Sequence, residues 1–440
     1  MYNIPLFIFY TIIYTLAVNS VYFFDGAWGW IAVPIIITIF LNIFIGSFNS
    51  KIKSVRLNFL NHGTGCLAVY FISTLISIVW LIVVMAGGGF EDHEVAFVAE
   101  LIFLFVNELI LYINGSVCVL TTSVQLGVTK RIVYLLLWVI PVVNLVIVPK
   151  TISTCHREVI TEVEKYRLNE KRKEEQVCKT RYPILMVHGI FFRDYKLLNY
   201  WGRIPDELIK NGAVIYYGMH SSADSVENCG QQLAARIKQI VEETGCEKVN
   251  IIAHSKGGLD CRAAMDYGAT PYVASLTTIN TPHRGCNFAD YLLNKAPDAL
   301  KTSVSKAYNV AASALGDINP DFIGGVSNLT ASFCSDFDSS HALPENVYCQ
   351  SVGSVMKVSK GGKFPLNFSN KLVKQFDGEN DGLVSMDSFD FGEKNIMLKT
   401  KYKRGISHGD VIDLNHENIR DFDVREFYVQ LVSDLKNRGF

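Results

Sequence analysis

The chain has 440 residues, a formal net charge of -1 and 49% hydrophobic residues, and its mean hydropathy is +0.22. This length leaves room for two or three domains, and the hydrophobic content exceeds that of an ordinary soluble domain. Because the nearly neutral charge supplies no basic field for a phosphate backbone, we exclude nucleic-acid binding.

Charged residues are scarce in the first third of the chain, where only twelve Asp, Glu, Lys or Arg side chains occur in residues 1–150. A bilayer core requires about 20 predominantly apolar residues per helix. We therefore predict a membrane region of about five helices here. Its first apolar run is too long for a cleaved signal peptide, and we expect it in the mature protein. The predicted spans are Ile4 to Phe24, Trp28 to Phe48, Cys66 to Ala86, Val95 to Ile113 and Ile132 to Val148.

Two features of this region leave alternatives open. Basic residues after the second span favour a cytoplasmic loop there, and five spans would then place the rest of the chain outside the cell. Basic residues after the fifth span instead favour placing the rest of the chain inside. The two groups are Lys51, Lys53 and Arg56, and Lys150, Arg157, Lys165 and Arg167. Glu100 and Glu108 would lie at bilayer depth, either as a site or as an interior-facing pair satisfied by other helices.

Residues 151–180 are crowded with both signs of charge, which predicts a solvated helical stalk. Beyond them, in residues 181–440, short apolar runs alternate with longer helical patterns. This alternation predicts a mostly parallel sheet with helices on both faces. The expected strands are Ile184 to Val187, Ala213 to Tyr217, Val249 to Ala253, Val273 to Ile279, Val347 to Val352 and Asn395 to Leu398.

The segment Ala253-His254-Ser255-Lys256-Gly257 lies between a buried strand and a helix start. A serine on such a turn needs small residues two positions before and after it, because larger side chains collide with the backbone. Ala253 and Gly257 meet this condition, although the generic pattern has glycine first. The alternative is an ordinary serine in a glycine-rich turn. We predict that Ser255 is a nucleophile, with the backbone N–H groups of Ile190 and Lys256 as an oxyanion hole.

Several motifs in residues 182–285 together resemble secreted bacterial triacylglycerol lipases. The resemblance implies an α/β-hydrolase fold for residues 181–440, with a cap or lid at residues 286–346, and says nothing about the membrane half. The matching pieces are Pro183 to Ile190, Tyr200-Trp201-Gly202, Gln231-Gln232-Leu233, Val249 to Gly258, and Asn280 to Gly285.

In such hydrolases the acid and then the histidine follow the serine along the chain. Asp381 matches the acid-bearing loop of the family, with Asp377 as its rival, and His408 matches the catalytic histidine. The rivals of His408 are His416 and His341, whereas His283 and His254 are expected to be structural.

Similar lipases ligate a structural calcium two residues after the histidine, where this chain has Asp410. One carboxylate does not supply the six to eight oxygen ligands of calcium. The expectation is therefore that no cofactor is required, with Asp410 as a candidate calcium ligand.

These features predict a membrane-anchored serine lipase or esterase that hydrolyses glyceride-like lipid esters through an acyl-enzyme on Ser255. Its partners would be a lipid ester and the bilayer, and we expect a multi-pass protein of the bacterial plasma membrane, with the side of the catalytic domain left open. A phospholipase or a lipid acyltransferase of the same fold is the enzymatic alternative. A protein without enzymatic activity would be either a catalytically inactive membrane scaffold or a channel-like or transport protein.

Overall fold

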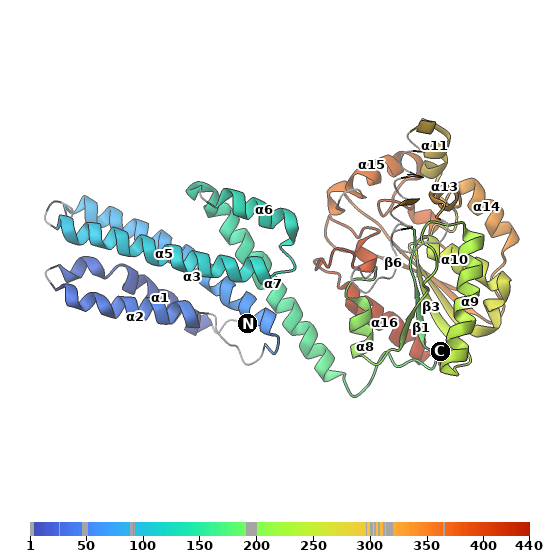
Figure 1. Ribbon diagram of the computed structural model, residues 1–440, viewed down its shortest axis with the longest axis horizontal. Helices are drawn as coiled ribbons and strands as arrows, with labels where there is room; N and C mark the ends of the chain where they lie inside the picture. Colours follow the sequence, from blue (N-terminus) through green and yellow to red (C-terminus); the bar gives the residue numbers. More distant parts are fainter. Residues whose placement is uncertain are drawn as a thin grey trace. The chain divides into compact units, whose positions relative to one another are not determined.

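A computed structural model of the chain divides into two compact units, Met1–Leu168 and Asn169–Phe440, and each is described by itself (Figure 1). The structure describes residues 4–25, 27–45, 52–88, 91, 93–138, 140–190, 200–295, 297–299, 302, 305–306, 309–310, 313, 320–363 and 366–440.

The first unit is helical. Two of its described helices, α3 and α5, are long and apolar enough to cross a membrane, whereas the segments Ile4–Val18 and Trp28–Phe44 are shorter. The helices are α1 (Ile4–Val18), α2 (Ala32–Phe44), α3 (Val55–Ala86), α5 (Glu94–Thr122), α6 (Gly127–Leu137) and α7 (Pro141–Lys171), with the 3-10 turns η1 (Val21–Phe24) and η2 (Trp28–Ile31).

Two of the five predicted spans are not single continuous helices over the predicted range. The first ends at Val18 after 15 residues, which is about 22 Å of helix and short of a bilayer core of about 30 Å. The fifth is interrupted between Leu137 and Pro141, because proline suits the first turn of a helix and not its interior. Residues 46–48, the end of the second predicted span, lie outside the described residues.

Glu100 and Glu108 on α5 both face the interior of the first unit. The Glu108 carboxylate accepts hydrogen bonds from Ser73 Oγ at 2.6 Å and Thr74 Oγ1 at 3.2 Å, both on α3. Glu100 Oε2 accepts from the backbone N–H of Tyr22 at 2.9 Å. These contacts fit an interior-facing pair in which both Glu108 oxygens and one Glu100 oxygen are hydrogen-bonded to neighbouring segments.

The expected stalk is not a separate element, because α7 continues without a break to Lys171. Its Glu158 is only 2% exposed, so a solvated stalk is a wrong description of this part. The carboxylate accepts from Arg56 Nη1 at 2.6 Å and Ser123 Oγ at 2.7 Å, and also from the backbone N–H groups of Val124 and Gln125. Glu158 therefore caps the turn that precedes α6.

The second unit contains a six-stranded, all-parallel sheet in the order β2-β1-β3-β4-β5-β6. All six predicted strands are confirmed, with ends shifted by at most two residues. The strands are β1 (Ile184–Val187), β2 (Ile215–Tyr217), β3 (Val249–His254), β4 (Val273–Ile279), β5 (Tyr348–Ser354) and β6 (Lys394–Leu398).

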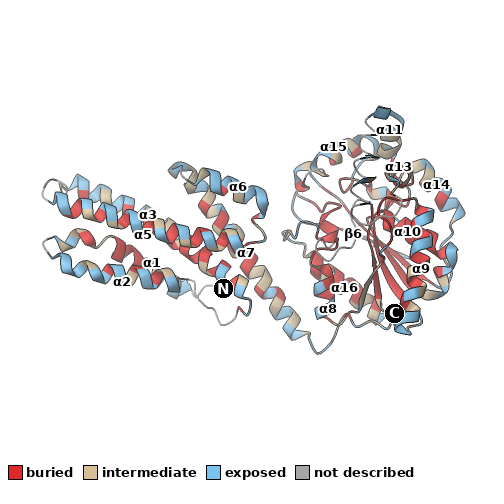
Figure 2. Cartoon of the chain, in the orientation of Figure 1, coloured by how far each residue is buried: buried red, intermediate tan, exposed pale blue. Residues whose placement is uncertain are grey.

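Helices cover both faces of this sheet, as predicted (Figure 1). Successive residues of a strand point to opposite faces, so Ile184 and Met186 pack with α8 and α16, and Leu185 and Val187 pack with α9 and α10. Figure 2 shows the resulting buried layers on either side of the strands. The helices are α8 (Ile204–Lys210), α9 (Val226–Thr244), α10 (Lys256–Ala264), α11 (Asn287–Lys295), α13 (Phe322–Ser327), α14 (Ala331–Ser340), α15 (Leu366–Asp377) and α16 (Val424–Asn437).

Candidate active site

Ser255 occupies the turn that joins β3 to α10, with φ of 55° and ψ of -134°. Side chains rarely adopt this conformation, and it costs on the order of 1–3 kcal/mol unless the surroundings enforce it. The surroundings here are tight. A Cβ atom at Gly257 would collide with the backbone oxygen of His188, and one at Gly258 would collide with Thr281. The glycines therefore allow the sharp turn that presents Ser255.

Asp381 and His408 are brought together by the loops that follow β5 and β6. The Asp381 carboxylate is fully buried and accepts from His408 Nδ1 at 2.6 Å. It also accepts from the backbone N–H groups of Leu383 and Val384 and from Asn280 Nδ2. Since a carboxylate only accepts, His408 carries its proton on Nδ1, which leaves Nε2 as the basic nitrogen.

The turn that carries Ser255, here called the elbow, and the Asp381 carboxylate are both hydrogen-bonded to residues at the end of β4. The backbone N–H of Ser255 donates to Ile279 O at 2.9 Å, and the next residue, Asn280, donates its side-chain amide to Asp381 at 2.6 Å. His254 lies beside His408, with ring centroids 4.5 Å apart. Within the described part of the chain, no hydrogen bond joins the Ser255 hydroxyl to His408. Such bonds often tighten only when substrate binds.

Asp377, the rival acid, makes a different set of contacts. Its carboxylate accepts from the backbone N–H groups of Asn287 and Phe288, and so it caps the start of α11. Of the rival histidines, His341 pairs with Asp266 at 3.1 Å and stacks on a phenylalanine ring.

His416 and His283 also lie in other settings. His416 lies in a loop with φ of 51°. His283 is buried, stacks on Phe391 and contacts Thr278 Oγ1 at 3.0 Å. Burial and then Arg262 hold the pKa of His283 well below its ordinary value. These contacts match the structural role expected for it.

The two expected oxyanion donors lie on either side of the elbow. Ile190 is buried and follows β1, and the preceding Gly189 lies so close that an added Cβ would be 2.7 Å from Ser255 Cβ. Lys256 is the first residue of α10, so its backbone N–H has no acceptor within that helix.

Asn280 supports the Asp381 carboxylate, a role that the motifs did not predict. The sequence feature that could have revealed this role is the position of Asn280 directly after the predicted strand Val273 to Ile279 and before Thr281-Pro282.

The side chain of Lys256 forms a buried ion pair beneath the elbow. Its Nζ lies 2.6 Å from Asp260 Oδ1 one helical turn later, and both residues are 1% exposed. His220 Nε2 approaches the other Asp260 oxygen at 3.5 Å. Burial raises the pKa of Asp260 to about 6, against the opposing effect of Lys256. The 2.6 Å contact between the two side chains joins the first and second turns of α10.

Asp260→Asn is expected to lower the free energy of unfolding of the protein by about 3–5 kcal/mol, because it leaves the Lys256 ammonium buried without its counter-charge. The matched control is Asp434→Asn, which breaks exposed pairs with Arg438, at the same spacing, and with Lys394. That change is expected to cost about 1 kcal/mol or less. Urea unfolding measures both, and equal midpoints would contradict a special role for the buried pair.

Asp410 does not fit a calcium site. Its oxygens accept from Arg404 Nη1 at 2.8 Å and Nη2 at 3.2 Å, and from the backbone N–H of Ser407 at 2.8 Å. A guanidinium therefore neutralises the carboxylate. No group of three or more His, Cys, Asp or Glu side chains suited to a metal occurs among the described residues. Asp410 instead orders the loop that carries His408.

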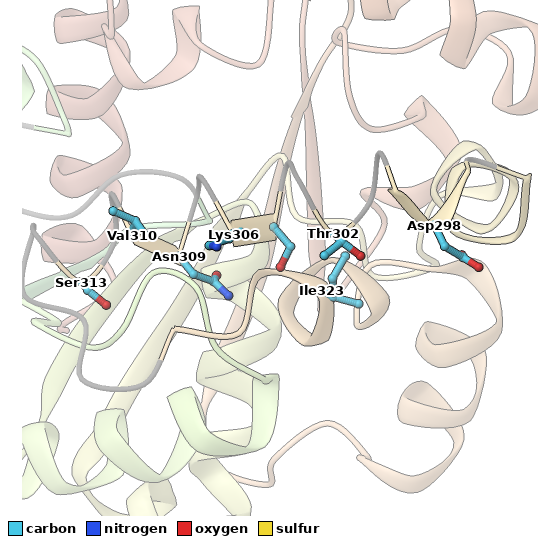
Figure 3. A pocket seen from close by; sticks show the side chains of 8 residues that line it. Asp298, Thr302, Lys306, Asn309, Val310, Ser313 and Ile323 are labelled. Carbon is cyan, nitrogen blue, oxygen red and sulfur yellow. The ribbon is translucent and has the colours of Figure 1, made fainter.

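The expected lid segment, residues 286–346, contains α11, α13 and α14 and lies partly outside the described residues. A cavity of about 790 Å³ is bordered by this segment (Figure 3). Asn309 Oδ1 accepts from the backbone N–H of Phe322 and so joins one wall to α13. Six of its eight lining residues carry polar side chains. They are Asp298, Thr302, Ser305, Lys306, Asn309, Val310, Ser313 and Ile323.

The chain is similar in sequence to triacylglycerol lipases of several organisms. The chain is 41% identical over 137 residues to a triacylglycerol lipase of Pseudarthrobacter phenanthrenivorans, which covers 29% of this chain and 43% of that protein. It is 41% identical over 137 residues to a triacylglycerol lipase of Burkholderia plantarii, covering 29% and 38%. It is 27% identical over 270 residues to triacylglycerol lipase 2 of Saccharomyces cerevisiae, covering 55% and 75%. The chain thus spans less than half the length of the first two relatives, and no protein-family model matches it.

Among solved structures, the chain is similar to the lipase of Staphylococcus hyicus, with a TM-score of 0.47 and 19% identity over 59% of this chain and 97% of that one. It is also similar to the mature lipase BlEst2 of Bacillus licheniformis, with a TM-score of 0.43 and 23% identity over 57% and 91%. The second unit has the α/β-hydrolase fold, with a parallel sheet between helices and a sharp strand-to-helix turn after β3.

Proposed function

We propose that the chain is a membrane-anchored serine hydrolase that cleaves carboxylic esters of lipids, with Ser255 as nucleophile, His408 as base and Asp381 as its partner. The observation that carries this proposal is the 2.6 Å hydrogen bond between Asp381 and His408. The His408 ring lies 4.5 Å from that of His254, the residue before a serine held at φ of 55° on a strand-to-helix turn. A strained backbone conformation such as that of Ser255 is typical of functional sites and is not required by a structural His–Asp pair.

In the proposed reaction, His408 Nε2 removes the Ser255 hydroxyl proton as Oγ attacks the ester carbonyl. The N–H groups of Ile190 and Lys256 stabilise the oxyanion of the tetrahedral intermediate. The protonated His408 then gives its proton to the departing alcohol, which leaves an acyl-enzyme on Ser255. Water attacks the acyl group with His408 again as base, so the carboxylic acid is released and the serine is restored.

The lipid nature of the substrate is supported by the relatives at 41% identity, which are named triacylglycerol lipases. A glyceride-like ester is therefore the proposed substrate. A phospholipase or an acyl transfer to an alcohol would use the same Ser255 chemistry, and we treat both as outcomes of the substrate experiment below. An inactive scaffold is disfavoured because Asp381 and His408 stay hydrogen-bonded to each other.

Membrane anchoring is supported by the distribution of side chains on α3 and α5. Polar groups such as Ser73, Ser77 and Glu108 are buried in the first unit, whereas large apolar side chains are exposed on the outside of these helices. This is the reverse of a helix in water and suits a hydrocarbon solvent. The exposed residues include Ile72, Ile76, Val79, Ile82, Val83, Ile102, Phe105 and Val106.

The full chain is accordingly expected to stay in the membrane pellet after extraction at alkaline pH and to enter solution only with detergent. The measurement is an immunoblot of pellet and supernatant. A peripheral protein of the same cells serves as the control that must be released. Release of the chain by alkali would overturn the anchoring and leave the proposed chemistry untouched.

Substrate class is tested by lipid profiling of membranes that contain the active protein or its Ser255→Ala variant. The proposal expects glycerides to fall and fatty acids to rise only with the active protein. A fall of phospholipids instead identifies a phospholipase, and a new acylated alcohol without fatty acid identifies a transferase. Identical lipid profiles, together with no turnover of a medium-chain aryl ester, would support the inactive scaffold.

A further inference from the structure

Gly189, the residue before the proposed oxyanion donor, is hydrogen-bonded at both ends. Its backbone N–H donates to the Tyr200 hydroxyl at 3.0 Å, and its carbonyl oxygen lies 2.8 Å from His188 Nδ1. Peptide bonds are planar and trans, so a fixed Gly189 carbonyl also fixes the direction of the Ile190 N–H. The orientation of the Ile190 N–H therefore depends on the side chains of His188 and Tyr200, which hold Gly189 in place.

Tyr200 connects this loop to the nucleophile turn. Its hydroxyl oxygen lies 2.6 Å from Nδ1 of His254, the residue that precedes Ser255. Because the hydroxyl accepts the Gly189 N–H, its own proton is available for donation to Nδ1. Burial and then the neighbouring His408 hold the pKa of His254 well below its ordinary value, so the ring is neutral and can accept that proton.

The His254 ring is 1% exposed and has a second role in the geometry. Its centroid lies 4.5 Å from that of the His408 ring, and Trp201 packs edge-on against it. A single hydrogen-bonded chain, from Gly189 through Tyr200 to His254, thus touches the oxyanion loop, the elbow and the base. The sequence predicts only a structural role for His254, because neither the spacing nor the motif reveals its contact with Tyr200.

We propose that Tyr200 and His254 are positioning residues that hold the Ile190 N–H at the place where the oxyanion forms on the carbonyl attacked by Ser255. This inference rests on the proposed hydrolase function. Neither residue donates or accepts a proton in the proposed reaction. An oxyanion donor acts on the transition state and not on the bound ester, so its misplacement lowers kcat and leaves KM nearly unchanged.

Tyr200→Phe removes only the hydroxyl and is the first test. With a medium-chain aryl ester, kcat is expected to fall about 10- to 100-fold, the size of effect that a misplacement of about 1 Å produces, whereas KM changes by less than about twofold. The matched control is Tyr428→Phe, since Tyr428 is buried in the same core and its hydroxyl donates to Val411 O at 2.9 Å. This control loses a comparable hydrogen bond and is expected to keep its kcat.

An arylboronic acid supplies a readout that a general loss of stability does not change. It forms a tetrahedral adduct on the nucleophilic serine and places an oxygen in the oxyanion hole. Its inhibition constant is expected to rise in Tyr200→Phe by the same factor by which kcat/KM falls. The Tyr428→Phe variant should bind the boronic acid as the unaltered protein does.

His254 provides the complementary test. His254→Asn retains an acceptor for the Tyr200 hydroxyl and is expected to recover part of the kcat that His254→Leu loses. Because both residues act through one chain, the double variant Tyr200→Phe with His254→Leu should be no slower than the slower single variant. If the kcat losses of the two single variants multiply in the double variant, the two residues act independently and the inference of one hydrogen-bonded chain is contradicted.

The inference is overturned if Tyr200→Phe keeps the kcat of the unaltered protein, or loses no more than Tyr428→Phe, or binds the boronic acid equally well. A protein without any Ser255-dependent turnover would overturn the proposed function and this inference together. Normal turnover with an unaffected Tyr200→Phe variant overturns this inference alone.

Discussion

Ser255→Ala is expected to reduce the turnover of a medium-chain aryl ester by a factor on the order of 10⁴ or more, because no other atom can form the acyl-enzyme. Binding and the oxyanion donors remain, so a small residual rate above that in water is consistent with the account. The removed hydroxyl makes no hydrogen bond to His408 in the described structure, and the protein should therefore stay folded. Initial rates with purified protein in detergent provide the measurement.

The matched control for this change is Ser275→Ala. Ser275 is a fully buried serine on β4 whose hydroxyl donates to Asn250 Oδ1 at 2.7 Å, away from the elbow. It should cost some stability and leave kcat unchanged. Equal residual rates in the two alanine variants would refute the assignment of Ser255.

The second large effect is expected for Asp381→Asn, with a loss of about 10⁴ in kcat. The Asp381 oxygen that accepts from His408 Nδ1 also accepts from the Asn280 amide. An amide group at that position would face the donor of Asn280 and would offer a proton to Nδ1. His408 would then hold its own proton on Nε2, where it cannot accept one from Ser255.

Asp377→Asn is the control for this substitution, because Asp377 lies in the same turn and caps α11. It should lower stability by about 1 kcal/mol or less, because the N-terminus of α11 loses a negative charge, and leave kcat nearly unchanged. The kcat of both variants is measured with the aryl ester, and circular dichroism verifies that each is folded. A larger loss of kcat in Asp377→Asn than in Asp381→Asn would exchange the roles given to these two residues.

The parts of the second unit that are defined by local sequence were predictable. Buried strands such as Val249–His254 show as short apolar runs, and the small residues around Ser255 are a steric requirement of the turn. Asp381 and His408 were selected by the family resemblance and by their order in the chain, and the structure brings the two side chains into hydrogen-bond contact.

Contacts between distant segments were not predictable in the same way. Asn280 supports an acid 101 residues later, and Tyr200 bonds a histidine 54 residues away. Glu158 was counted among the charges of a solvated stalk, although it caps a turn 33 to 35 residues earlier. Charge and periodicity describe the neighbours of a residue along the chain, and these roles depend on its neighbours in space.

The membrane half shows the same limit in another form. Hydropathy located the apolar stretches but not the points at which helices end, and so α1 proved shorter than the predicted first span and Pro141 divided the fifth. The buried partners of Glu100 and Glu108 come from η1 and α3, which pattern alone could not select.

The central claim is that Ser255 is a nucleophile activated by His408. Its most direct test is mass spectrometry of the intact folded chain, and then of its peptides, after reaction with a fluorophosphonate. The account predicts one adduct per chain, located on Ser255, with labelling strongly slowed in His408→Ala and absent in Ser255→Ala. Hydrolysis without an adduct on Ser255, or labelling that persists at the same rate in Ser255→Ala, would contradict it.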